Sequence, residues 1–303
     1  MNRGAEGRGA TPALCRFTRR LAIGFAEILT LRQDGDATYI GAPGPGVGKR
    51  LFGGHTLAQG LVAATLAEDG GRMPHSLHAH FLKLGNADIP VRYEVATLNE
   101  GRSFATRRVD AVQGEAHLLT MTVSLHIEEE GHRHAEPMPG VPDIAQARAA
   151  FEAWRARQEQ PERLPILGRL WERPVETVPL DPQTLFGSDP AAPRSANWMR
   201  VREPEPVDPA TARAQLAYAS DMLFLRNALL PHGVRPGASR MQVASLDHAM
   251  WLHETPDFSR WHLYTGHSPW AGGARGFTYG HFFAENGTLV ATVAQENLMR
   301  VRS

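Results

Sequence analysis

The sequence repeats one unit, an apolar helix followed by four strands, and this repeat limits the possible folds most strongly. Residues 53–66 are apolar nearly all round a helix, which is typical of a buried helix. Alternating apolar residues and Gly/Asn turns then predict strands at 76–84, 91–98, 103–112 and 116–126. A second buried helix, about 209–230, precedes strands near 241–252, 261–265, 276–284 and 288–299. Two helices, each wrapped by an antiparallel sheet, predict an α+β fold in which the two sheets can join.

Short segments in the two halves match directly. Arg102-Ser-Phe104 finds its counterpart in Arg275-Gly-Phe277. Leu118–Ser124 aligns with Leu289–Gln295 at a constant offset, which places Ser124 opposite Gln295. Such self-similarity indicates a duplicated unit.

The remaining segments are expected to flank these two units. Residues 25–31 and 36–40 read as short strands joined by a turn at 33–35. Residues 143–160 can form a surface helix, and the proline-rich stretch 161–206 reads as a long connection without a second packed core. We therefore divide the chain into an N-terminal extension, a first unit, a connector and a second unit, at 1–20, 21–135, 136–205 and 206–303.

Asp221 is a carboxylate on an otherwise apolar helix face. Ala214, Ala217, Tyr218, Phe224, Leu225 and Ala228 stand three, four or seven residues from it, at positions that share one face of a helix. Burying an unpaired carboxylate is costly, so the chain must supply partners or the group must titrate abnormally. Asp221 is thus either a structural residue bonded to nearby backbone or a functional one.

Two further polar residues interrupt apolar strand faces in the second unit. Gln295 is expected to share a strand face with Ala291 and Val293. Ser245 is expected to share a face with Asp247. The same alternation points His248 to the opposite face, so we do not expect it to activate Ser245.

Composition excludes several classes of function. The formal net charge is zero, which argues against non-specific binding to nucleic acid or to anionic membranes. Cys15 is the only cysteine, so there is no disulfide framework, and a reducing cytoplasm is the default location. No apolar run is long enough to span a bilayer. The histidines lack the spacing of a metal motif, so no metal site is expected.

Six dispersed blocks resemble those of the type II acyl-CoA thioesterases, over roughly residues 20–130 and 196–301. The blocks are Phe52-Gly-Gly-x-x-x-Ala-Gln59, His75-Ser-Leu-His-Ala-His-Phe81, Gly101-Arg-Ser-Phe-x-x-Arg107, Leu216-Ala-Tyr-Ala-Ser-Asp221, Ala244-Ser-Leu-Asp-His-Ala-Met-Trp251 and Gln295-Glu-x-x-Met-Arg300. This resemblance implies a double hotdog fold, in which two tandem hotdog units form an internal pseudo-dimer. It also implies hydrolysis of an acyl-CoA without a cofactor, by chains that assemble as homodimers or homotetramers.

The resemblance further implies a catalytic trio of Asp221, Ser245 and Gln295. Asp221 would act as the general base on a water that Ser245 and Gln295 orient, and no covalent intermediate is required. Residues expected to contact substrate are Gly53, Gly54, His55, Gln59, Arg102 and Arg275. Arg102 could meet coenzyme A phosphates.

The first unit is expected to lack a working site, because its buried helix holds Gln59 and no acidic residue. His55 and Asn297 also depart from the family pattern, which commonly has Gln and Gly there. These departures keep open an alternative, a weak or inactive paralogue that only binds acyl-CoA. A hotdog hydratase is less favoured, because its Gly-Asp-x-Asn-Pro-like signature is not found.

Overall fold

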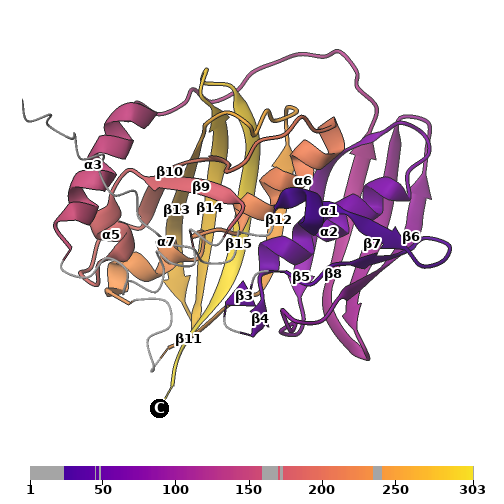
Figure 1. The fold of residues 1–303 in the computed structure, drawn as a ribbon, viewed down its shortest axis with the longest axis horizontal. Coiled ribbons are helices and arrows are strands. Elements are labelled where there is room, and N and C mark those ends of the chain that lie inside the picture. The colour runs from indigo at the N-terminus through magenta and orange to yellow at the C-terminus, as the bar shows by residue number, and fades with distance from the viewer. Residues whose placement is uncertain are drawn as a thin grey trace, which may run out of the picture.

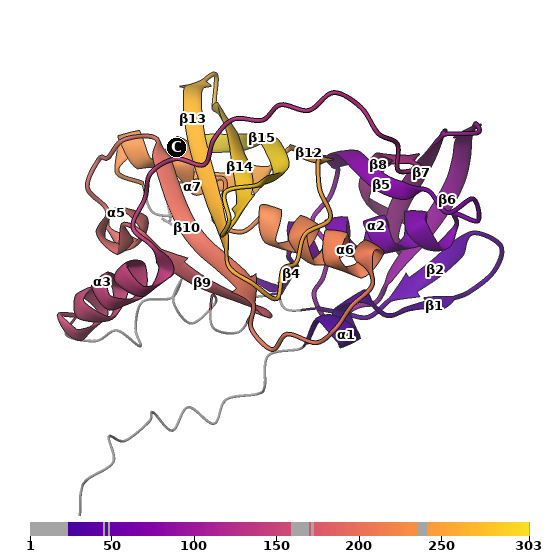
Figure 2. The ribbon, with the colours of Figure 1, turned by 90° about the horizontal axis from the view of Figure 1, so that it is seen from above.

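A computed structural model describes residues 24–44, 46–47, 49–158, 170, 173–234 and 241–302. Most of its strands form one sheet in the order β1-β2-β6-β7-β8-β5-β12-β15-β14-β13-β10-β9, with β11 paired to β15, and β3 and β4 form a separate two-stranded sheet. The order on either side of the central β5–β12 pair is the same when read outward, so the two halves repeat one topology. The sheet curves around two central helices, α2 and α6 (Figures 1 and 2). This arrangement is the double hotdog, which confirms the fold class predicted from sequence.

The first unit begins with a short helix and ends with a long meander. Its elements are α1 (Phe25–Leu29), β1 (Leu31–Gln33), β2 (Thr38–Gly41), β3 (Gly46–Val47), β4 (Arg50–Leu51), α2 (Gly53–Leu66), β5 (Met73–Phe81), β6 (Val91–Glu100), β7 (Phe104–Gln113) and β8 (Ala116–His126). The predicted strand at 25–31 is wrong, because Phe25, Ile28 and Leu29 are buried on one face of α1. Their i, i+3, i+4 spacing is that of a helix.

The second unit repeats the two outer strands, the long helix and the meander of the first unit, and it differs from the first unit in its short helices and strands. Its elements are β9 (Val175–Pro179), α5 (Pro182–Phe186), β10 (Arg194–Val201), α6 (Pro209–Ser220), α7 (Arg226–Leu229), the 3-10 turn η2 (Leu230–His232), β11 (Met241–Ser245), β12 (Asp247–Leu252), β13 (His262–Gly272), β14 (Arg275–Ala284) and β15 (Leu289–Val301). β9 and β10 extend the sheet from β13, as β1 and β2 extend it from β6.

The prediction that 161–206 is only a connection is therefore wrong. A division at 205/206 separates β10 from β13, the strand with which it pairs. Helix α3 (Ile144–Ala156), which confirms the predicted surface helix, packs here with α5. Phe151, Phe186, Trp198 and Trp261 belong to this second hydrophobic cluster. Prolines hid the strands, because pattern-based reading treats Pro as a breaker. The proposed extension at 1–20 lies outside the described residues.

The two long central helices pack directly against each other. A Cβ built on Gly54 would lie 2.4 Å from the Tyr218 carbonyl oxygen, so only glycine allows this approach. The contact places the N-terminus of α2 beside the C-terminus of α6. Asp221 lies at that junction.

The predicted helix 209–230 is interrupted at Asp221. Asp208 caps the N-terminus of α6 by accepting bonds from two backbone N–H groups, and Asp221 is its C-cap residue. The Tyr264 hydroxyl donates to the Ser220 carbonyl oxygen at 2.6 Å, and Leu223 adopts a positive φ of 64°. These features end the helix, so Asp221 stands at a helix end and not within a continuous face.

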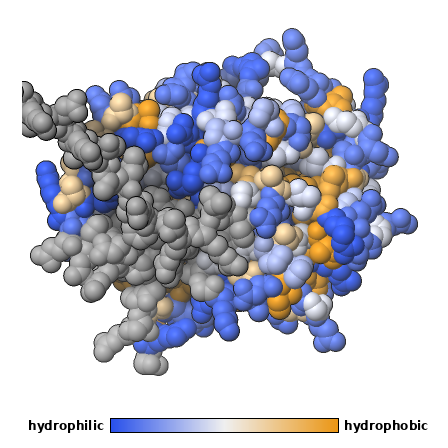
Figure 3. Space-filling view, viewed as in Figure 1, coloured by the Kyte–Doolittle hydropathy of each residue, from blue (hydrophilic) through white to orange (hydrophobic). Residues whose placement is uncertain are grey.

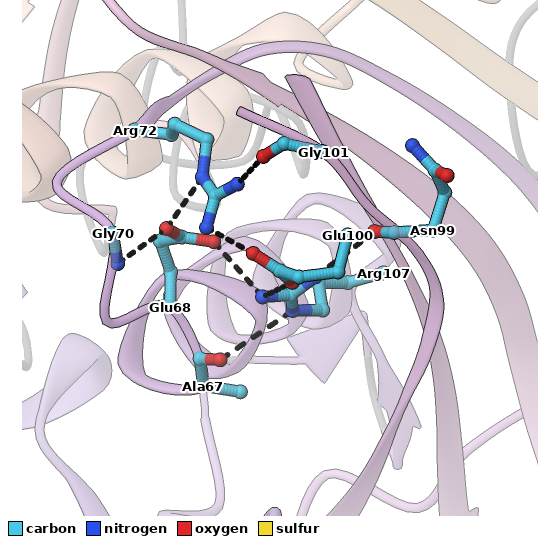
Figure 4. Close-up of polar contacts among 8 residues, drawn as sticks. All are labelled: Ala67, Glu68, Gly70, Arg72, Asn99, Glu100, Gly101 and Arg107. Carbon is cyan, nitrogen blue, oxygen red and sulfur yellow. Dashed lines mark hydrogen bonds and ion pairs between the residues drawn. The ribbon is translucent and has the colours of Figure 1, made fainter. Parts of the chain in front are cut away.

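A buried ion network closes the other end of α2 (Figure 4). Glu68 pairs with Arg72 at 2.8 Å and with Arg107 at 2.9 Å, and its side chain is only 2% exposed. Glu100 pairs with the same two arginines. Glu68, Asp69 and Glu100 converge in a way that could suit a cation, but the arginines already neutralise two of these carboxylates. We read the network as structural.

Hydrophobic and hydrophilic side chains are unevenly distributed over the visible surface (Figure 3). On the face seen in Figure 3, hydrophobic side chains gather mainly over the first unit, and hydrophilic ones cover most of the rest of the visible described surface. Among the described residues, no helix is long and apolar enough to cross a membrane.

Candidate active site

The candidate site is centred on the buried carboxylate of Asp221. Its Oδ2 atom accepts the backbone N–H of Gly54 at 2.9 Å, and its Oδ1 atom lies 3.4 Å from the Ser245 hydroxyl. The positive end of the α2 dipole thus faces this carboxylate. The carboxylate has the partners that its burial requires.

Ser245 and Gln295 meet at the same place from two paired strands, β11 and β15. The Gln295 amide nitrogen donates to the Ser245 hydroxyl at 2.9 Å and to the Asn297 side-chain oxygen at 2.7 Å. The Ser245 hydroxyl can in turn donate to Asp221. The three residues selected from sequence are therefore linked in one hydrogen-bonded chain.

Burial dominates the electrostatics of Asp221. Desolvation raises the pKa of its carboxyl to about 6, and the Gly54 N–H bond, the Arg173 charge, the Ser245 bond and the nearby Gln295 amide oppose this rise. A carboxyl with a pKa near 6 is largely ionised at neutral pH yet basic enough to accept a proton.

Arg173 is a site residue that sequence reasoning missed. Its guanidinium donates to the Tyr218 hydroxyl at 2.9 Å and stacks 3.7 Å from the centre of the Phe52 ring. Tyr218 and Phe52 flank the junction of α6 and α2, so Arg173 brings a buried positive charge close to Asp221. Nothing in the spacing of the proline-rich segment distinguished this arginine from the others.

His248 also belongs to the site, and the prediction that it faces away is wrong. Leu246 is an extra residue between β11 and β12: Ser245 pairs with Asn297, whereas Ala249 pairs with Ala294. Such a bulge reverses the alternation of faces. His248 therefore points inward, where its Nδ1 atom lies 2.6 Å from the Gln295 amide oxygen.

Asp247 turns outward for the same reason. Its carboxylate accepts the backbone N–H of Glu296 at 2.7 Å. It does not share a face with Ser245, contrary to the sequence prediction.

The first unit carries apolar residues at the equivalent positions. β7 and β14 have the same burial pattern and the same bulge, at Ala111/Val112 and Phe282/Phe283. This register matches Val123 with Gln295, so the prediction that Ser124 takes that place is wrong by one residue. It also matches Phe104, not Arg102, with Arg275.

The same register identifies the partners in the strand that follows each central helix. Leu77 pairs with Val123 where His248 contacts Gln295, and Pro74 pairs with Leu125 where Ser245 pairs with Asn297. At these four strand positions the first unit carries apolar side chains where the second unit carries Ser245, His248, Gln295 and Asn297.

The residues expected to contact substrate fall into three environments. Gly53 and Gly54 lie against Asp221, and a Cβ on Gly53 would stand 2.6 Å from its Oδ2 atom. His55 and Gln59 are buried and used within the first unit. Gln59 donates to the Ile28 and Ala42 carbonyl oxygens, and the Tyr93 hydroxyl donates to it.

The two arginines of that group lie on the surface instead. Arg102 is exposed in the turn between β6 and β7. Arg275 is half-exposed and pairs with Glu296 at 3.1 Å. The structure does not bring either arginine into contact with the trio.

A groove of about 520 Å³ lies beside the start of α6. It is lined by residues that include Pro206, Val207, Gln215 and Phe258. α6 has 12 residues, so this end lies roughly 18 Å along the helix from Asp221. The groove is therefore separate from the polar cluster.

Fold and site together define a double-hotdog protein with a buried polar cluster centred on Asp221. Two family models match the chain: "Acyl-CoA thioesterase" over residues 169–298 and "Acyl-CoA thioesterase N-terminal domain" over residues 42–126. The first of these matches includes Asp221, Ser245 and Gln295.

Curated relatives and solved structures agree with the family models. Acyl-CoA thioesterase 2 of Haemophilus influenzae is 33% identical over 83% of this chain and 88% of its own length. Human acyl-coenzyme A thioesterase 8 is 34% identical over 84% of this chain and 82% of its own length. The crystal structure of an acyl-CoA thioesterase II, TesB2, from Mycobacterium marinum matches with a TM-score of 0.72 at 33% identity. The match covers 92% of this chain and 98% of that chain. The chain belongs to the acyl-CoA thioesterase family, which confirms the resemblance seen in its sequence blocks.

Proposed function

We propose that this acyl-CoA thioesterase hydrolyses the thioester of an acyl-CoA to a free fatty acid and coenzyme A, with Asp221 as general base. The observation that carries the mechanism is the chain of bonds from Gln295 through Ser245 to a buried carboxylate. A thioester carbonyl is electrophilic enough for direct attack by water, so a base and an orienting hydroxyl suffice.

In the first step, Asp221 takes a proton from a water molecule while the water oxygen bonds to the thioester carbon. With a pKa of about 6, roughly nine-tenths of the carboxyl is ionised at pH 7. Ser245, held by Gln295, orients the attacking water and so lowers the entropic part of the barrier.

In the second step, the tetrahedral intermediate collapses and the carbon–sulfur bond breaks. Negative charge on the former carbonyl oxygen is stabilised by the N-terminal turn of α2, whose positive dipole end lies at Asp221. The proton held by Asp221 passes to the leaving sulfur. This returns the carboxylate and releases coenzyme A.

Gly53 and Gly54 are the best-placed of the substrate-contacting candidates, because they border Asp221 without side chains. We propose that the acyl thioester is held against them. The exposed Arg102 and Arg275 are candidates for coenzyme A phosphates.

We also propose that the chain acts in the cytoplasm as a homodimer or homotetramer. Neutral net charge and a single cysteine support that location. Exposed aromatic side chains on the sheet, among them Trp251 and Tyr279, offer surface for self-association. Light scattering coupled to gel filtration tests the assembly, and a monomer at micromolar concentration would contradict it.

One observation favours the alternative of a weak catalyst that mainly binds acyl-CoA. Asn297 accepts one of the two Gln295 amide hydrogens, which leaves Gln295 no free donor for a water. Free-thiol release measured over a panel of acyl-CoAs separates the two functions. We expect turnover of at least one chain length; binding across the panel without turnover would support the alternative.

A further inference from the structure

Four hydrogen bonds link five polar side chains of the second unit, and the peptide bond between Ser220 and Asp221 closes them into a ring. From Asp221 the ring passes through Ser245, Gln295 and His248 to Ser220, which precedes Asp221 in α6. The His248 Nε2 atom lies 2.8 Å from the Ser220 hydroxyl. The ring therefore begins and ends on neighbouring residues of one helix.

The chemistry of each group sets the direction of these bonds. The Gln295 amide oxygen can only accept, so the His248 Nδ1 atom must carry a hydrogen. Burial lowers the pKa of His248 to about 4, so its imidazole is neutral at physiological pH. With a hydrogen on Nδ1, its Nε2 atom is an acceptor. The Ser220 hydroxyl supplies the hydrogen, which it shares with the Ala217 carbonyl oxygen at 2.8 Å.

In this arrangement the oxygen of the Gln295 amide faces His248 and its nitrogen faces the site. With its oxygen held by His248, the amide nitrogen points to Ser245 and Asn297. Because Ser245 accepts from Gln295, its own hydrogen is free to point at Asp221. Rotating the amide by 180° would set its N–H groups against the Nδ1–H of His248.

The first unit shows that the fold does not need this histidine. Leu77 occupies the matching position, is fully buried, and pairs with Val123 in the place of Gln295. An apolar pair therefore packs well in this environment, whereas a buried imidazole and amide must both be satisfied. The histidine occurs in the unit whose matching strand carries the glutamine.

We propose that His248 is a positioning residue that fixes the orientation of the Gln295 amide, and so directs the Ser245 hydroxyl at Asp221. This inference rests on the proposed function, since it assigns a role to His248 through the same site. His248 does not touch the reacting atoms. Its effect is on kcat, because it organises the groups that orient the water and not the groups that hold coenzyme A.

Two substitutions of His248 test the proposal. His248→Leu removes the donor to Gln295 and introduces the residue found in the first unit. We expect kcat to fall on the order of 10- to 100-fold with KM unchanged. His248→Asn keeps an N–H donor near the place of Nδ1, so it should recover most of that loss. His262→Leu, which removes another buried histidine outside the ring, should leave kcat unchanged.

A double-mutant cycle with Gln295→Val then asks whether His248 acts through Gln295. If it does, His248→Leu costs nothing further in the Gln295→Val background. The double variant carries the Leu–Val pair of the first unit, so it should remain folded. The proposal would be overturned if the fold losses in kcat of the two single variants multiplied in the double variant. Equal losses of kcat in His248→Asn and His248→Leu would also overturn it.

Asp221→Asn, measured in the same series, separates the inference from the proposed function. Wild-type kcat in Asp221→Asn would overturn the mechanism itself. A large loss in Asp221→Asn with wild-type kcat in His248→Leu would overturn only the role of His248.

Discussion

At the scale of single residues, the site depends on a balance around one carboxylate. Burial raises the pKa of Asp221, and the bonds from Gly54 and Ser245, the nearby Gln295 amide and the Arg173 charge pull it back. A base is useful near neutral pH only if neither side of this balance dominates. Arg173 is the only fully charged group among these opposing contributions, so it is the most direct one to change.

Substitution of Arg173 by Met removes its charge and keeps an unbranched chain over Phe52. Because a nearby cation favours the ionised carboxylate, its loss should raise the pKa of Asp221. The ascending limb of kcat/KM against pH should then move to higher pH, and kcat/KM at pH 7 should fall. Arg173→Lys, which keeps the charge, is the control. An unmoved limb in Arg173→Met would show that this charge does not act on Asp221.

At the scale of the elements, the junction of α2 and α6 and the bulge at Leu246 set the geometry of the site. The junction brings a helix N-terminus to Asp221, and the bulge turns both Ser245 and His248 inward. The sequence shows the helices through their apolar character. It does not show the bulge, because strict alternation through residues 241–252 places His248 outside.

Gly54→Ala tests the helix junction. Alanine normally stabilises a helix interior relative to glycine by about 1 kcal/mol. Here its Cβ would meet the Tyr218 carbonyl oxygen at 2.4 Å, and this backbone atom cannot rotate away. We expect the free energy of unfolding to fall by about 1–3 kcal/mol, as for other overpacked sites.

The same substitution should lower kcat, because the Gly54 N–H bond to Asp221 lengthens as the helices separate. Gly24→Ala is the matched control, since nothing lies within 4 Å of the added methyl group. Urea unfolding and steady-state kinetics on both variants provide the comparison. Equal stability of Gly54→Ala and wild type would contradict the tight junction.

At the scale of the whole molecule, one duplicated fold carries two different polar interiors. The first unit buries an ion network at Arg107, and the register places Thr278 at the equivalent position of the second unit, beside Gln295. The first unit is thus stabilised by charge pairs, and the second holds the candidate site. This position is thus divided between charge pairs in the first unit and, in the second unit, the polar side chains of a site that Gly54 of the first unit completes.

Glu68→Gln should therefore destabilise the protein without impairing the site. It leaves Glu100 to neutralise both Arg72 and Arg107, which costs up to about 3 kcal/mol, the lower end for a broken buried pair. Thermal or urea unfolding measures this loss, and kcat of the folded enzyme should stay at the wild-type value. Glu94→Gln, in an exposed pair with Arg92, should change stability by roughly 0.5 kcal/mol or less. Matching losses in the two variants would refute the division.

Much of this architecture could be predicted from the sequence, and the errors have physical causes. The predicted helix 53–66 matches α2 residue for residue. The ends of the predicted strands 76–84, 91–98, 103–112 and 116–126 differ by only a few residues from those of β5, β6, β7 and β8. The predicted alignment of Ser124 with Gln295 is wrong by one residue, and a shift of one residue along a strand moves every side chain to the opposite face. Residues 173–201 were missed because long-range pairing, not local periodicity, makes β9 and β10 strands.

The central claim is that Asp221, with a pKa near 6, is the general base. The most direct test is the dependence of kcat/KM on pH for wild type and Asp221→Asn. Since only the ionised carboxylate can accept a proton, wild-type kcat/KM should rise with pH through about 6 and then level off. Asp221→Asn should lose most of the rate at every pH and show no such limb. An unchanged limb near pH 6 in Asp221→Asn would contradict the account.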